Sequence, residues 1–153
     1  MVEITKNLYV GDDNDFKTID DGWYIIHACK EPYHRRLLGY TTRSCPMCGE
    51  YYYAERDNIL YLNLVDAKTV QYIPKIVINK AIDFIENNIN EHKILLHCNK
   101  GESRSPSIAL LYLNKIGVIH ENNPLVGIDE FRKMYPNYKP NPGMFQYVLQ
   151  NWR

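Results

Sequence analysis

The chain has 153 residues, of which 45% are hydrophobic, and its 18 basic and 18 acidic side chains give a formal net charge of zero. This length fits one domain over residues 1–153 with a sizeable core. The neutral balance gives no reason to expect nucleic acid or an anionic membrane as a partner. No apolar stretch approaches the roughly 20 residues of a membrane-spanning helix, and the first residues lack the apolar core of a signal peptide. We therefore expect a monomer without membrane association.

Apolar segments with two different spacings alternate along the chain. Short apolar runs predict strands at residues 8–11, 23–28, 58–65 and 93–97. Helical spacing predicts helices at residues 73–91, 106–116, 124–134 and 142–152, with Pro74 in the first turn of the first helix. The alternation indicates a three-layer α/β fold. Its mostly parallel central sheet of about four to five strands would be flanked by helices, with the site at the carboxyl ends of the strands.

The most informative run is residues 95–106, in which a cysteine and an arginine lie six positions apart around a glycine-containing loop. The loop follows an apolar strand and precedes an apolar helix. A helix N-terminus offers unpaired backbone N–H groups and the positive end of its dipole, so a loop that closes onto it can surround a phosphate group. We expect this loop to bind the phosphoryl oxygens through Asn99, Lys100, Gly101, Glu102, Ser103 and Arg104.

Each residue type in this loop suits a step of phosphoryl chemistry. Cys98 would be the nucleophile, because a helix N-terminus stabilises a thiolate. The planar guanidinium of Arg104 suits bidentate binding of two phosphoryl oxygens. Ser105 could donate a hydrogen bond to the sulfur when the thiolate leaves, and Gly101 supplies backbone freedom for the turn. These residues predict a phosphocysteine mechanism.

The string His97-Cys98, Gly101 and Arg104-Ser105 matches HCxxGxxRS, and the chain resembles the dual-specificity phosphatases of the cysteine-dependent protein tyrosine phosphatase superfamily. The resemblance implies a phosphatase fold and hydrolysis of phosphotyrosine, phosphoserine or phosphothreonine in proteins. It also implies that catalysis needs no metal or other cofactor. Because the nucleophile must remain a free thiol, we expect a reducing cytoplasmic location.

The family mechanism needs an acid to protonate the leaving oxygen. Asp66 follows the predicted strand at residues 58–65 and lies 32 residues before Cys98, a separation that resembles the family's. We expect it to act first as acid and then as base, although an ordinary helix-capping or loop carboxylate is the alternative. His97 is expected to orient the loop without transferring protons. Asn141 resembles a family asparagine that supports the loop, and it could equally cap a helix.

The segment at about residues 29–57 is the least family-like part of the chain, and loops this long are uncommon. Cys45-Pro46-Met47-Cys48 has the form of half a zinc site, which Cys29, His27 or His34 could complete. We do not favour this structural zinc. Cys29 ends a strand expected beside the one that ends at Cys98. The string Ala28-Cys29-Lys30-Glu31 also resembles a strand end in the tensin-like lipid phosphatases, where a cysteine in that place can form a disulfide with the oxidised nucleophile. Cys29 is therefore a candidate redox partner for Cys98, with a small core residue as the alternative.

The substrate is the least determined property. The negative charge of Glu102 offsets the positive charge of Lys100 in the loop. Polyanionic lipid headgroups are therefore less favoured as substrates than phosphoproteins. Small phosphorylated metabolites and RNA 5′ ends are further alternatives, and a basic groove would be expected for RNA. Two other classes remain open at this stage: a pseudophosphatase that binds phosphorylated partners without turnover, and a sulfur-transfer or redox protein.

Overall fold

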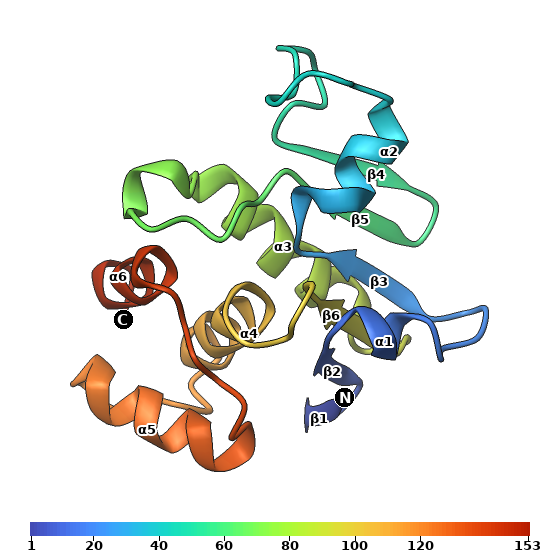
Figure 1. Ribbon diagram of the computed structural model, residues 1–153. Coiled ribbons are helices and arrows are strands. Elements are labelled where there is room, and N and C mark those ends of the chain that lie inside the picture. The colour runs from blue at the N-terminus through green and yellow to red at the C-terminus, as the bar shows by residue number, and fades with distance from the viewer.

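The computed structural model describes residues 1–153 as a six-stranded sheet covered by helices (Figure 1). The strand order is β1-β2-β6-β3-β5-β4. The four central strands are parallel, whereas β1 and β4 pair antiparallel at the two edges. The strands are β1 Val2–Thr5, β2 Leu8–Gly11, β3 Tyr24–His27, β4 Tyr53–Arg56, β5 Ile59–Leu62 and β6 Ile94–His97.

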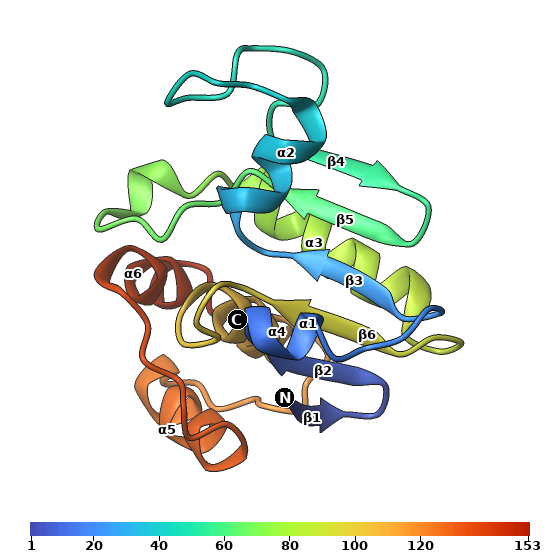
Figure 2. The same ribbon diagram turned by 45° about the vertical axis from the view of Figure 1, so that its right-hand side comes forward.

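Helices cover both faces of the sheet, and Figure 2 shows α1 on the face opposite α3 and α4. The long helices form one side of the molecule, and the shorter α1 contacts β2 and β6 from the other side. The helices are α1 Asp13–Phe16, α2 Arg35–Leu38, α3 Lys75–Asn88, α4 Arg104–Lys115, α5 Pro124–Met134 and α6 Pro142–Gln150. A π-helical turn at Lys30–His34 precedes α2, and a 3-10 turn at Val70–Tyr72 precedes α3.

The predicted α/β architecture is confirmed, and three details of it are wrong. The sheet has six strands and not four to five. The prediction missed the two short edge strands, β1 and β4, because they carry few apolar residues. Helix α4 begins at Arg104, two residues before the predicted start. Pro74 is the N-cap of α3 and lies outside its first turn, with an extended backbone at ψ 135.

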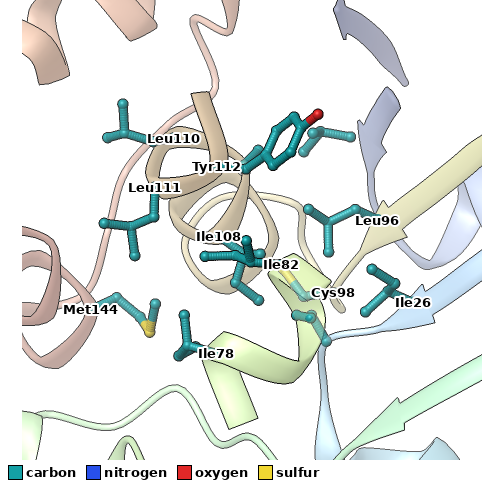
Figure 3. Close-up of a cluster of buried hydrophobic side chains, with 14 of the residues drawn as sticks. Ile26, Ile78, Ile82, Leu96, Cys98, Ile108, Leu110, Leu111, Tyr112 and Met144 are labelled. Atoms are coloured by element: carbon teal, nitrogen blue, oxygen red, sulfur yellow. The ribbon is translucent and has the colours of Figure 1, made fainter. Parts of the chain in front are cut away.

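The core lies between the sheet and its long helices. Leu96 of β6 and Ile26 of β3 face Ile78 of α3 and Ile108 of α4 in a cluster that also contains Cys98 (Figure 3). Burial of apolar surface contributes roughly 25 cal/mol per Å², so this cluster holds α4 against the end of β6. The position of Cys98 is therefore set by the core of the protein.

Polar contacts within the segment at residues 29–57 help to hold its shape. The buried His34 bonds to the hydroxyl of Tyr40 through Nδ1 and to the carbonyl of Glu50 through Nε2, each at 2.9 Å. Arg35 donates to both carboxylate oxygens of Glu31 and to the carbonyl of Thr42. Because burial lowers the pKa of His34, its ring remains neutral at neutral pH and can serve as a fixed link across the segment.

No helix of the structure combines the length and the apolar character that crossing a membrane would require.

Helix α6 approaches the loop after β5 at a position where only glycine fits. A Cβ atom on Gly143 would lie 2.3 Å from the carbonyl oxygen of Ala67. We predict that Gly143→Ala lowers the free energy of unfolding by about 1–3 kcal/mol, the usual cost of overpacking. Urea denaturation measures this loss.

Gly49→Ala is the matched control, because a Cβ at Gly49 meets open space. It should change stability by less than about 0.5 kcal/mol, as surface substitutions do. Equal stability of the two variants would contradict the packing argument.

Candidate active site

The loop between β6 and α4 forms a tight turn around Cys98. Gly101 has a backbone φ angle of 67°, a left-handed conformation that glycine adopts without strain. A Cβ at this position would lie 2.9 Å from the carbonyl oxygen of Gly11. The hydroxyl of the buried Tyr135 donates to the carbonyl of Gly101 at 2.6 Å. The turn is therefore held from two sides, by β2 and by the residue that follows α5.

Cys98 is 2% exposed and lies at the carboxyl end of β6, as predicted. Its Sγ is 3.2 Å from the Oγ of Ser105 and 3.5 Å from the backbone nitrogen of the same residue. The Ser105 hydroxyl is also 3.3 Å from the carbonyl of Gly11. Two donors of Ser105 can thus stabilise negative charge on the sulfur, once the hydroxyl proton turns from that carbonyl.

Arg104 begins α4 and is held by two hydrogen bonds. Its guanidinium donates to the carbonyl of Leu64 at 2.9 Å and to Oδ1 of Asn99 at 2.8 Å. Its Nε is buried and has no hydrogen-bond partner. An unsatisfied buried donor lowers the stability of a protein by about 1–3 kcal/mol. A bound anion would remove this cost by accepting a hydrogen bond from the Nε–H group.

The backbone N–H groups of residues 99–104 donate no hydrogen bond within the protein. They belong to the loop and first turn of α4, where helix geometry leaves such donors unpaired. A cleft of about 290 Å³ opens there, lined by Asp66, Cys98, Asn99, Lys100, Glu102, Ser103, Arg104, Lys139 and Asn141. Six of the predicted phosphate-binding and catalytic residues therefore meet with the predicted acid at one cleft, while Gly101 lies buried behind it.

Asp66 lies in the loop after β5. A serine binds it to the loop at residues 98–104, which we call the cradle. The Ser103 hydroxyl donates to Oδ1 of Asp66 at 2.9 Å and accepts from the backbone N–H of Asn141 at 3.0 Å. The supporting contact predicted for Asn141 thus comes from its main chain. The alternative of a helix cap also describes its position, because Asn141 is the N-cap residue of α6, although its side chain makes no capping hydrogen bond.

His97 is fully buried, and its Nε2 lies 2.6 Å from Nδ1 of His27. Burial lowers the pKa of His97 to about 4 and that of His27 to about 2. Both rings are therefore neutral at neutral pH, which agrees with an orienting role for His97.

Cys29 is fully buried at the end of β3, beside β6. Burial raises the pKa of its thiol, and the negative charges of Cys98 and Asp13 raise it further, against the opposing charge of Arg104. Cys29 and Cys98 both belong to the buried core cluster, and each lies just beyond the carboxyl end of a strand, Cys29 after β3 and Cys98 after β6.

Cys45 and Cys48 lie near each other in the segment at residues 29–57, one buried and one exposed. They belong to no cluster of three metal-ligating side chains. Both ring nitrogens of His34 are already engaged with Tyr40 and Glu50. Structural zinc at this pair stays a hypothesis.

Three supporting residues escaped the sequence analysis. Asp13 accepts a hydrogen bond from the Asn99 side chain at 3.1 Å and so orients a residue that binds Arg104. Tyr135 holds the turn at Gly101, and Lys139 adds a cation to the cleft. None of the three belongs to a local motif, and each lies more than 30 residues from Cys98 in the sequence. Only the fold brings them to the site.

Comparison with known proteins supports the resemblance. No family model matches the chain. It is 35% identical over 94 residues to the dual specificity protein phosphatase YVH1 of Plasmodium falciparum (isolate 3D7), a match that covers 59% of this chain and 15% of that protein. Among solved structures, DUSP15 has a TM-score of 0.64 at 22% identity, covering 99% of this chain and 87% of that one. Human DUSP28 has a TM-score of 0.67 at 12% identity, covering 99% and 91%.

The fold is that of the dual-specificity phosphatases. The fold that the sequence resemblance implied is therefore confirmed. The chain spans only 15% of the length of the curated phosphatase that it matches, so the match concerns one region of that protein.

Mild peroxide should join Cys29 to Cys98. Peroxide would oxidise the Cys98 thiolate to a sulfenic acid, and attack by the Cys29 sulfur would form the disulfide and release water. Mass spectrometry of peptides from the oxidised protein measures the crosslink. The variant with both Cys45→Ser and Cys48→Ser should retain the crosslink. A sulfinic acid at Cys98 with no crosslink between Cys29 and Cys98 would contradict the prediction.

Proposed function

We propose that this chain is a cysteine-dependent phosphomonoesterase that hydrolyses phosphotyrosine and phosphoserine or phosphothreonine in proteins. The observation that carries the proposal is the set of free donors beside Cys98. Six backbone N–H groups and the Arg104 Nε have no partner within the protein. A phosphoryl group carries several strong acceptor oxygens and satisfies such a set.

The reaction would proceed in two steps. In the first, the Cys98 thiolate attacks phosphorus, the S–P bond forms and Asp66 gives a proton to the departing oxygen. In the second, the Asp66 carboxylate takes a proton from water, which attacks phosphorus and releases the thiolate. The two Ser105 donors, at 3.2 and 3.5 Å from Sγ, stabilise the thiolate as it leaves.

The charge around the cleft supports a phosphoprotein as substrate. Lys100 and Lys139 line it together with Glu102 and Asp66. Such a mixed rim suits one phosphate on a peptide better than a polyanionic lipid headgroup or an RNA end, for which an excess of positive charge would be expected. The similarity to proteins named as dual specificity phosphatases supports the same substrate class.

We predict that the protein releases phenol from an aryl phosphate in a single turnover and that Cys98→Ser abolishes this release. Excess chelator should not abolish this release, because no step of the reaction uses a metal ion. Cys48→Ser is the matched control, since it removes an exposed thiol outside the cleft.

Release of phenol by Cys98→Ser, or its loss in chelator, would reject phosphocysteine chemistry. Inactivity of the wild type toward aryl phosphates and phosphopeptides alike would also reject it. Vanadate binding would then identify a pseudophosphatase.

Asp66→Asn should slow the reaction by roughly 10²–10⁴-fold, the usual worth of a positioned acid. The loss should be larger for phenyl phosphate than for p-nitrophenyl phosphate, because the poorer leaving group depends more on protonation. Measurement of the single-turnover rate on both esters tests this. A change below about threefold would assign the acid to another residue, given that expected range.

Ser103→Ala gives a companion measurement, because Ser103 holds Asp66 and is a positioning residue in this respect. It should show the same dependence on the leaving group with a smaller loss of rate. An equal loss on both esters would mean that Ser103 acts on phosphate binding alone.

A further inference from the structure

A second cluster of reactive side chains lies beside the cradle, at the carboxyl ends of the central strands. Asp13 begins α1, Cys29 follows β3 and His97 ends β6. One potential ligand atom from each lies within 4.8 Å of the others. The phosphatase mechanism uses none of the three as a reacting group.

The ring of His97 leaves one nitrogen without a partner in the interior. Its Nε2 is engaged with His27 at 2.6 Å, whereas its Nδ1 makes no hydrogen bond although the residue is 0% exposed. This Nδ1 is 3.5 Å from Oδ1 of Asp13. Metal binding at Nδ1 requires the tautomer in which Nε2 carries the ring proton and donates it to His27, because the lone pair of Nδ1 then faces the cluster.

The Asp13 carboxylate is itself held by neighbouring donors. The hydroxyl of Tyr33 donates to Oδ1 at 2.7 Å and the Asn99 side chain donates to Oδ2 at 3.1 Å. Hydrogen bonds of this kind orient ligands in metal sites, as does the contact of a ligating histidine through its other nitrogen. Both features of a metal site's outer shell are therefore present.

We propose that Cys29, His97 and Asp13 form a binding site for one Zn²⁺ ion. A thiolate, an imidazole and a carboxylate are the donors that zinc accepts, at about 2.0–2.3 Å each, with water in a fourth position. A separation of 3.5 Å between Nδ1 and Oδ1 suits two adjacent corners of such a site. The thiol proton of Cys29 passes to solvent when the ion binds.

The site would link metal binding to the cradle and to its oxidation. Asp13 bonds to Asn99, which in turn accepts from Arg104. The ion and the 29–98 disulfide require the same sulfur, so each excludes the other.

The test uses a full-length variant in which Cys45, Cys48 and Cys98 are each replaced by serine, so that Cys29 is the one thiol left. Zn²⁺ is titrated against a chromogenic chelator, and one ion per chain is expected. Adding Cys29→Ser should weaken binding more than the roughly 10–100-fold typical of losing an outer-shell partner. With Co²⁺ as probe, a thiolate-to-metal charge-transfer band should be present before that change and absent after it.

Tyr33→Phe supplies a variant that keeps all three ligands and removes only the hydrogen bond to Asp13. It should weaken Zn²⁺ binding by roughly 10–100-fold, and it keeps the proposal open to test where Cys29→Ser fails to fold. Circular dichroism establishes folding of each variant. No stoichiometric Zn²⁺ binding, or equal affinity with and without the Tyr33 hydroxyl, would overturn the site.

Discussion

The turn from β6 into α4 leaves a group of main-chain donors unpaired, and the rest of the site is arranged around them. A helix N-terminus cannot satisfy its first N–H groups internally. In this protein the left-handed Gly101 bends the preceding loop so that those groups line a cleft with Cys98. The buried hydroxyl of Tyr135 and the carbonyl of Gly11 close around that glycine, which makes the turn rigid before any ligand binds.

The parallel sheet supplies the other parts, because parallel strands end at one edge. That edge carries Cys98 after β6 and Cys29 after β3. It also carries Asp66 in the loop after β5 and Asp13 at the start of α1, which follows β2. The cradle and the proposed metal site are thus neighbours that share a scaffold and are joined through Asn99. The proposed nucleophile and the proposed redox and metal-binding cysteine are physically adjacent for this reason.

Much of the fold was predictable because its periodicity is local. Helix α5 has the predicted bounds, and the four parallel strands lie inside the predicted segments. The edge strands β1 and β4 were missed, since an edge strand is stabilised by pairing with its neighbour and needs no apolar run. The start of α4 at Arg104 was also missed, because no apolar residue marks it in the sequence. The contacts of the loop and the core place Arg104 in the first turn of the helix.

The sequence by itself determined the chemistry of the cradle, since the spacing of Cys98, Gly101 and Arg104 specifies a strand, a turn and a helix N-terminus in adjacent order. It also singled out Asp66 and Cys29 from their places at strand ends. Only the tertiary structure decided how Ser103 holds Asp66 and how His97, Asp13 and Cys29 meet. Those contacts join residues from separate elements, and their geometry follows from sheet order and core packing, which no local pattern encodes.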